Sequence, residues 1–349
     1  MRLLLGLAAW MAGAQAQSLT PLPTPPQTQD STAAVEAGVP ARSLSSWLMR
    51  LQEASRRRTY IGTLVVSSGT ILSSSRIWHV CDGEQQIERV ESLTGVPRST
   101  FRRNEDVITF SPDTRVARME RRDALGSFPG MLRLADHTVE QFYSVKALAG
   151  QRVAGLDADV VQLVPRDGWR FGYRIWSEKQ TGLVLKLQTL DSQGRVLEQQ
   201  AFSELQLDAP VSRDKLTQMM RNTEGYRVER VQQHKTTASA EGWSLKPNVP
   251  GFKPVSCFRH GTAETGAPGR LLQCVYSDGL ASLSIFMAPH DPSQPGLQEG
   301  VSALGATQAL IRRVPGRAAD PEGGWWLTVV GEVPTSTLQA FAQGLERRK

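Results

Sequence analysis

Short segments with alternating apolar and polar residues follow one another through most of this sequence, and they constrain its fold more than any other feature. Alternation with period two, interrupted by Gly, Asp, Asn and Ser, predicts strands joined by tight turns. The predicted strands cover residues 60–67, 71–81, 87–92, 98–103, 107–111, 115–119, 145–148, 159–165, 169–177, 183–190 and 196–207. Sequential strands of this kind pair antiparallel, so we expect one strongly curved sheet, an open or partial antiparallel β-barrel.

Two helical segments accompany this predicted sheet. The first has apolar residues at helical spacing, and they form one stripe: Leu44, Trp47, Leu48 and Leu51. Ser43 stands at the N-cap position of this helix. The second is the dense apolar segment 123–144, broken by glycine and proline, which predicts a helical insert of short helices or a loop. The concave apolar face of the sheet must be covered by these helices or by a ligand.

A second alternating pattern lies near the other end of the chain, in the stretch VYSDGLASLSIFM at residues 275–287. Asp278-Gly279 is a strong signal for a two-residue hairpin turn. The resulting register would place Ser277 opposite Leu280 and Tyr276 opposite Ala281. One face of the hairpin is then apolar and carries Leu272, Cys274, Tyr276, Ala281, Leu283, Ile285 and Met287.

The segments around this hairpin predict a small α+β unit. Residues 252–258, 309–314 and 325–333 add strands, and Leu338, Phe341, Ala342 and Leu345 form the apolar stripe of a terminal helix. A four- or five-stranded antiparallel sheet with one helix on its apolar face satisfies the packing rules for such a unit. The whole chain is therefore predicted to be α+β, with a large curved sheet followed by a smaller sheet-and-helix unit.

The 349 residues divide into five predicted regions. Residues 1–16 have a positive start, a short apolar core and an A-x-A site, which are typical of a secretory signal peptide. Residues 17–42 are rich in Pro and Thr and predict a disordered leader. The large sheet occupies residues 43–210, a linker 211–241, and the small unit 242–349. The predicted signal peptide implies export to the periplasm.

Export permits disulfide bonds, and the chain has three cysteines. Cys257 and Cys274 lie on two strands that we expect to be neighbours, so they are the candidate pair. Cys81 is then left over, and it is either a small buried apolar residue or a reactive thiol.

The chain is basic, with a formal net charge of +6 that falls by one when Arg2 is removed with the signal peptide. A basic surplus is compatible with anionic lipid, an acidic protein partner or an ordinary solvated surface. Export argues against nucleic acid as the partner. Homo-oligomerisation is left open by the sequence.

Catalytic motifs are not recognisable in the sequence. Its five histidines show no metal-ligand spacing, and it contains no G-x-S-x-G, P-loop or G-x-G-x-x-G pattern. Ser277-Asp278-Gly279 superficially resembles a penicillin-binding box, but the accompanying motifs are absent in the required order. We therefore predict a binding protein that is not an enzyme and that needs no cofactor or metal.

Aromatic and apolar residues of the predicted sheet and its helical insert are candidates for lining an apolar cavity. They are Trp78, Phe128, Met131, Leu132, Phe142, Trp169, Phe171 and Tyr173. For each of them, packing in the core is an equal alternative. Three arginines just before the helical insert are candidates for binding acidic headgroups, or else are solvated: Arg118, Arg121 and Arg122.

Several short motifs, in their order along the chain, resemble the RseB/MucB family of periplasmic regulators of the envelope-stress sigma factor, sigma-E. They are Ile77-Trp78-His79-Val80, Phe128-Pro129-Gly130-Met131-Leu132, Tyr173-Arg174-Ile175-Trp176, Lys179-Gln180-Thr181-Gly182-Leu183 and Tyr276-Ser277-Asp278-Gly279-Leu280-Ala281. The proline-rich leader departs from the family pattern, and so do Cys257 and Cys274.

The resemblance implies a large domain similar to the lipoprotein carriers LolA and LolB, with an apolar cavity, and a smaller domain that helps to bind a partner. That partner would be the periplasmic domain of an RseA/MucA-like membrane anti-sigma factor, which the protein shields from the stress protease. Lipid or lipopolysaccharide fragments would release the shield. The alternative is a periplasmic lipid or lipoprotein carrier of the LolA type without a regulatory role.

Overall fold

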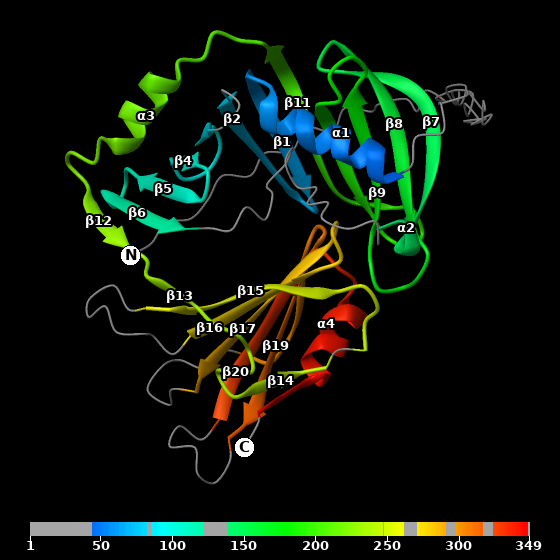
Figure 1. The fold of residues 1–349 in the computed structure, drawn as a ribbon, viewed down its shortest axis with the longest axis vertical. Coiled ribbons are helices and arrows are strands. Elements are labelled where there is room, and N and C mark those ends of the chain that lie inside the picture. Colours follow the sequence, from blue (N-terminus) through cyan, green and yellow to red (C-terminus); the bar gives the residue numbers. More distant parts are fainter. Residues whose placement is uncertain are drawn as a thin grey trace, which may run out of the picture. The chain divides into compact units, whose positions relative to one another are not determined.

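Two separate β-sheets contain most of the described residues (Figure 1). The computed structural model describes residues 44–81, 85–121, 139–246, 248–261, 271–290, 298–316 and 324–347. By their internal contacts, residues Val35–Lys349 form one unit. No helix within the described ranges is both long enough and apolar enough to cross a membrane.

The large sheet has 12 strands in the spatial order β12-β6-β5-β4-β3-β2-β1-β11-β10-β9-β8-β7. Its strands are β1 (Tyr60–Ser68), β2 (Ile71–Cys81), β3 (Gln86–Ser92), β4 (Ser99–Arg103), β5 (Asp106–Ser111), β6 (Val116–Arg121), β7 (Tyr143–Val153), β8 (Leu156–Pro165), β9 (Gly172–Glu178), β10 (Val184–Leu190), β11 (Val196–Leu207) and β12 (Arg227–Arg230). Neighbours pair antiparallel, except that β12 pairs parallel with β6. The sheet is open, with β12 and β7 as its edges.

Helices lie against opposite faces of this sheet: α1 (Leu44–Arg57) with α2 (Val139–Phe142) on one, and α3 (Arg213–Arg221) on the other. Successive residues of β2 demonstrate this, because Ile77 belongs to the core beneath α1 whereas Trp78 packs against the cluster that contains α3. The stripe predicted for the first helix is buried at Leu48 and Leu51. Most of the predicted helical insert, residues 122–138, lies outside the described residues.

The strands β7 and β8 are longer than their alternation indicated. They form one hairpin whose turn is Ala154-Gly155, both with positive φ. Side chains along β7 are mostly exposed, so this edge strand carries little of the apolar alternation by which a strand is recognised.

The small sheet has seven strands in the order β13-β15-β16-β17-β20-β19-β18, more than the four or five predicted. These are β13 (Gln233–Lys235), β15 (Lys253–His260), β16 (Leu271–Ser277), β17 (Ser282–Pro289), β18 (Gly300–Leu304), β19 (Thr307–Pro315) and β20 (Gly324–Gly331). The extra strands β13 and β18 are its edges, short and largely exposed. β14 (Trp243–Leu245) and β21 (Leu345–Arg347) pair separately, and α4 (Thr335–Gln343) is the helix.

The predicted register of the β16–β17 hairpin was wrong by two residues. Ser277 pairs with Ser282, and Tyr276 with Leu283, because the loop contains four residues rather than two. The Asp278 carboxylate accepts hydrogen bonds from the backbone N–H groups of Leu280 and Ala281, and this stabilises the wider turn. An even shift leaves every side chain on its predicted face.

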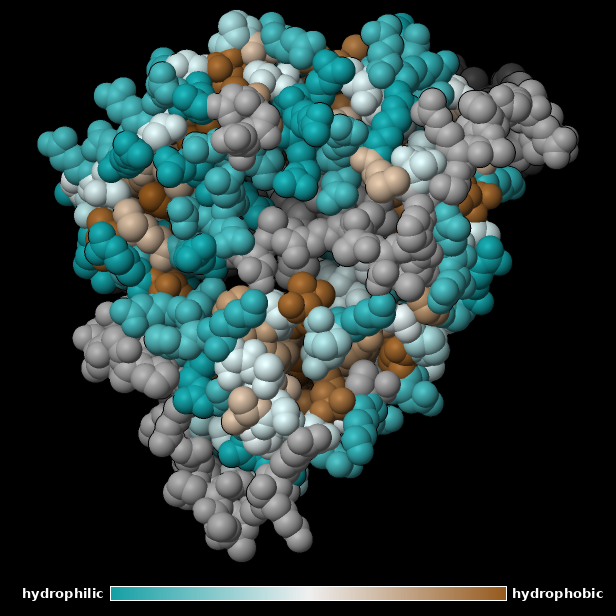
Figure 2. Space-filling view, viewed as in Figure 1, coloured by the Kyte–Doolittle hydropathy of each residue, from teal (hydrophilic) through white to brown (hydrophobic). Residues whose placement is uncertain are grey.

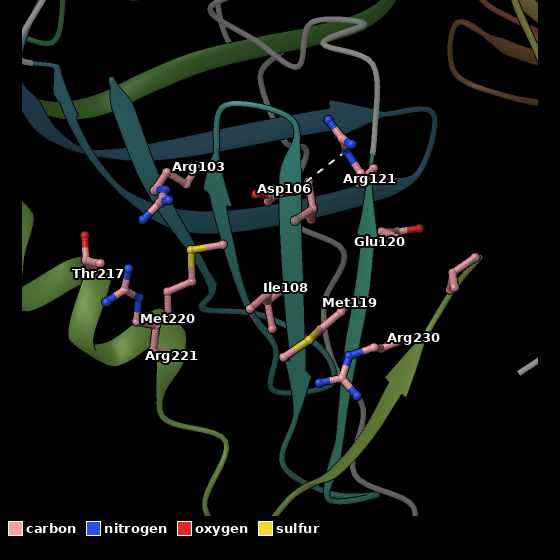
Figure 3. Close-up of a pocket in the computed structure, with 12 residues that line it drawn as sticks. Arg103, Asp106, Ile108, Met119, Glu120, Arg121, Thr217, Met220, Arg221 and Arg230 are labelled. Carbon is pink, nitrogen blue, oxygen red and sulfur yellow. Dashed lines mark ion pairs between the residues drawn. The ribbon is translucent and has the colours of Figure 1, made fainter. Parts of the chain in front are cut away.

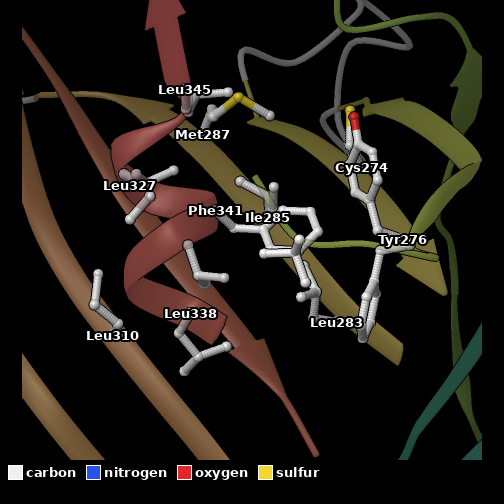
Figure 4. Packing of buried hydrophobic residues seen from close by; sticks show 14 of the residues in the cluster. Cys274, Tyr276, Leu283, Ile285, Met287, Leu310, Leu327, Leu338, Phe341 and Leu345 are labelled. Atoms are coloured by element: carbon white, nitrogen blue, oxygen red, sulfur yellow. The ribbon is translucent and has the colours of Figure 1, made fainter. Parts of the chain in front are cut away.

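That face forms the second main core, which is roofed by α4 as predicted (Figure 4). Phe341 of α4 is fully buried and lies 5.3 Å from the Tyr276 ring and 5.7 Å from the Phe252 ring. On the face shown in Figure 2, hydrophilic residues dominate over the large sheet, whereas hydrophobic residues gather over part of the small sheet. The predicted α+β class, with an open antiparallel sheet and a separate smaller one, is confirmed.

Candidate ligand-binding site

A cavity of about 360 Å³ lies between α3 and the strands at one end of the large sheet (Figure 3). Its apolar lining includes Ile108 of β5, Met119 of β6 and Met220 of α3. Four arginines also line it: Arg103, Arg121, Arg221 and Arg230. The cavity therefore combines apolar contact surface with a cationic rim. We call it the arginine pocket.

The local sequence explains why α3 forms a wall of this pocket. The Ser212 side chain accepts a hydrogen bond from the Lys215 N–H, 3.2 Å away, and caps the helix. Leu216 and Met220 are spaced i and i+4, so they lie on one helical face, and both are buried against the sheet. Arg221 is next in sequence and therefore lies at the edge of that buried face.

The pocket carries an excess of positive charge. Asp106 and Glu120 are its carboxylates, against the four arginines. Arg121 forms ion pairs with Glu105, at 2.7 Å, and with Asp106, at 3.8 Å. Among the described residues, no ion pair is seen for Arg103, Arg221 or Arg230. Arginines with free hydrogen-bond donors next to apolar side chains suit a ligand that has both an anionic group and a hydrocarbon part.

Of the two headgroup candidates that the structure describes, one lines this pocket and the other does not. Arg121 lines it, whereas Arg118 is exposed on β6 and does not contribute. Arg122 lies outside the described residues, as do the cavity candidates Phe128, Met131 and Leu132.

The described cavity candidates do not gather around one space. Trp78 packs on the α3 side of the sheet, where Arg89 lies 4.7 Å over its ring. Tyr173 and Phe142 belong to the opposite core beneath α1. Trp169 packs against the core of the small sheet, and Phe171 is buried. Each aromatic ring therefore fills core space where it stands, and ligand binding by these residues stays a prediction.

Sequence reasoning missed most of the pocket. Arg230 and Val231 reach it only because β12 returns to pair with β6, more than 100 residues earlier in the chain. These residues lie in the segment predicted as a linker, which contributes α3, β12 and β13. The i, i+4 pair Leu216 and Met220 followed by Arg221 was the local signal available for the helical wall.

Cys257 and Cys274 form a disulfide between β15 and β16, where they occupy directly opposite positions. Both side chains are buried in the small-sheet core. Cys81 ends β2 and is half-buried. Among the described residues, no cluster of histidine, cysteine and carboxylate groups could hold a metal ion.

Comparison with known families matches nearly all of the described chain. A model of the MucB/RseB N-terminal domain matches residues 43–220, and one of the MucB/RseB C-terminal domain matches residues 237–346. The chain belongs to the MucB/RseB family. The resemblance that the short motifs indicated is thereby confirmed.

Individual family members agree with this assignment. The sigma factor AlgU regulatory protein MucB of Pseudomonas aeruginosa is 29% identical over 306 residues, which cover 86% of this chain and 90% of MucB. The sigma-E factor regulatory protein RseB of Escherichia coli strain K12 is 21% identical over 302 residues, or 86% of this chain and 89% of RseB. A crystal structure of MucB in complex with MucA(peri) superimposes with a TM-score of 0.64 at 27% identity, covering 88% of this chain and 100% of that MucB chain.

Proposed function

We propose that this MucB/RseB family member is an exported, periplasmic binding protein whose partner is the periplasmic part of a MucA-like membrane anti-sigma factor. The observation that carries the proposal is the structural similarity to MucB, which was crystallised with MucA(peri) and whose whole chain is covered. Binding would shield the anti-sigma factor from the stress protease and so keep the sigma factor inactive.

Titration of the mature chain with the purified periplasmic segment of the anti-sigma factor tests this proposal. We expect saturable binding, measured by calorimetry, with a dissociation constant of about 1 µM or below, which corresponds to about −8 kcal/mol. A scrambled segment of the same composition is the matched control. Absence of heat and of co-elution at tens of micromolar would contradict the proposal.

The arginine pocket supports a ligand for the regulatory step. An anionic amphiphile, such as a lipid or a lipopolysaccharide fragment, has an acidic group for the arginines and acyl chains for Ile108, Met119 and Met220. A ligand that binds better to a conformation of low partner affinity must weaken the binding of the partner. We propose that ligand binding in the pocket releases the anti-sigma factor in this way.

Charge reversal at the pocket tests the ligand site. We expect Arg221→Glu/Arg230→Glu to weaken binding of purified lipid A by more than about tenfold, because charge-assisted hydrogen bonds are each worth about 1.5–3 kcal/mol. Arg118→Glu is the matched control, since Arg118 is an exposed arginine on β6 that does not line the pocket. Equal weakening by the control would indicate nonspecific attraction to a basic surface instead of a site.

The second candidate function is a lipid or lipoprotein carrier without a regulatory role, and the same pocket favours it. The two functions differ in the partner experiment. A carrier would bind lipid A through the pocket and would not bind the anti-sigma segment, whereas the regulator binds both.

A further inference from the structure

A buried ion pair joins the large-sheet part of the chain to the small-sheet part. Arg170 lies in the loop between β8 and β9, and Asp278 begins the turn between β16 and β17. Arg170 Nη1 is 2.7 Å from Asp278 Oδ2, and both side chains are fully buried. A buried pair that is far apart in sequence fixes how these two loops meet.

Every nitrogen of the Arg170 guanidinium has a partner. Nε donates to Asp167 Oδ1 at 3.0 Å, Nη1 to Asp278, and Nη2 to the Pro250 carbonyl oxygen at 2.6 Å. The guanidinium also lies 4.2 Å over the Phe142 ring. Gly251, with a φ of +87°, leaves room for that ring, which a side chain at this position would overlap. The arginine therefore holds three segments together.

Both carboxylate oxygens of Asp278 also accept hydrogen bonds. Its Oδ1 accepts from the N–H groups of Leu280 and Ala281, at 2.9 and 2.7 Å. Its Oδ2 accepts from Arg170 and from the Tyr143 hydroxyl, the latter at 3.4 Å. The Asp278 carboxylate thus stabilises the hairpin turn and also binds Arg170. The conformation of the turn and the position of Arg170 therefore depend on each other.

Beside the ion pair, one apolar side chain from each part of the chain packs against the core of the other part. Leu280 of the β16–β17 turn packs against the core beneath α1, and Trp169 packs against the core of the small sheet. Thr337 of α4 donates a hydrogen bond to the Trp169 carbonyl oxygen at 2.7 Å. We call this set of contacts, made by Asp167, Trp169, Arg170, Asp278, Leu280 and Thr337, the seam.

The chemistry of the seam favours two discrete arrangements over gradual loosening. Taking both charges out of water offsets much of their attraction, so the intact pair adds little net stability. Losing one partner alone leaves a charge buried without compensation, which is strongly unfavourable. We therefore expect the pair to be either fully made or fully hydrated.

We propose that the seam is a latch with a closed and an open state. In the closed state Arg170 and Asp278 are paired. In the open state both are hydrated, Leu280 leaves the core beneath α1, and Trp169 leaves the core of the small sheet. The closed state fixes the small sheet against the large one. Opening would change the surface that the large and the small sheet jointly present to a partner. Conditions or ligands that favour one state shift the population between them.

Hydrogen exchange of the full mature chain, without any partner, tests the latch. Arg170→Met removes the cation, and Asp278→Asn removes the charge while its amide oxygen can still accept from the turn. Thr337→Val removes only the hydrogen bond to Trp169. We expect exchange in segments 166–171 and 277–283 to rise by about tenfold or more in the first two variants, and by less in the third.

Arg174→Met is the matched control. Arg174 lies on β9, and among the described residues its hydrogen-bond partners are Gln162 and Gln188, both in the large sheet. We expect no change in either seam segment for this variant. Slow exchange retained in β9 and β17 would show that a variant is still folded, and if Arg170→Met unfolds, the two milder variants decide. Unchanged exchange in the hairpin of the folded variants, or an equal rise in the control, would overturn the latch.

The consequence for partner binding rests on the proposed function. The three seam variants should alter the affinity for the anti-sigma segment by the factor by which they change the population of the binding-competent state, and Arg174→Met should not. A wild-type chain that does not bind the segment would contradict the proposed function alone. Because exchange is measured without the segment, the latch is judged independently.

Discussion

The charge of one carboxylate, Glu198 of β11, acts on a second carboxylate, Glu332. Glu198 of β11 accepts hydrogen bonds from Ser68 Oγ at 3.0 Å and from Gln200 Nε2 at 2.8 Å. Glu332, directly after β20, has no such donors among the described residues. Burial first, and then the charge of Glu198, raise the pKa of Glu332 to about 7. Near pH 7 this carboxyl group is therefore about half-protonated, and its charge changes with pH around neutrality.

The raised pKa predicts that stability falls as pH rises. Below the ordinary value of 4.5 the carboxyl is protonated in both states and has no effect. Between 4.5 and about 7 the folded protein keeps a proton that the unfolded chain has lost, so the free energy of unfolding decreases across this window. We expect Glu332→Gln to remove that decrease and to stabilise the protein at pH 8 by about 1–2 kcal/mol.

Urea denaturation at pH 5 and pH 8 measures this difference. Glu224→Gln is the control, because Glu224 is an exposed glutamate in a loop. Parallel pH dependence in the wild type and Glu332→Gln would show that Glu332 is not the group responsible.

At the scale of elements, the disulfide binds β15 to β16 across a sequence separation of 17 residues. Closing a loop of this size lowers the entropy of the unfolded chain, and the expected stabilisation is about 3 kcal/mol. We therefore expect Cys257→Ala/Cys274→Ala to lower the free energy of unfolding by roughly this amount, with the transition of the small sheet affected first. Denaturant unfolding followed by near-ultraviolet circular dichroism measures it. The control Cys81→Ala leaves the disulfide intact. An equal loss in the free energy of unfolding in that variant would contradict the attribution of the stabilisation to the disulfide.

Alternation along single strands was enough to predict which side chains of the β16–β17 hairpin face the core, but not how the strands pair. The faces depend only on period two, which any even shift preserves. The register depends on the loop, and there Asp278 binds backbone N–H groups as well as Arg170, which is 108 residues away. A turn stabilised from such a distance cannot be read from its own sequence.

The same limit applies to the molecule as a whole. Sequential hairpins, the helix α1 and the helix roof α4 follow from local patterns, and they were predicted. The arginine pocket and the seam come from contacts between remote segments, such as β12 with β6 and Trp169 with Thr337. The cavity candidates were chosen for being aromatic or apolar, and such residues fill cores more often than they line ligand sites. Arg170, on the same segment as three of those candidates, was not among the predicted site residues, yet it is fully buried.

If a ligand in the arginine pocket releases the partner, as we propose, thermodynamic linkage predicts a reciprocal effect. If an anionic amphiphile lowers the affinity for the anti-sigma segment by some factor, the segment must lower the affinity for the amphiphile by the same factor. Couplings of this kind are typically about 5–150-fold. Calorimetric titrations in both orders, with lipid A and the anti-sigma segment, measure the two factors. The pocket variant Arg221→Glu/Arg230→Glu should abolish the effect of the amphiphile and leave the affinity for the segment alone unchanged. Simultaneous binding without mutual effect would refute the coupling, because a ligand that does not discriminate between two states cannot shift their populations.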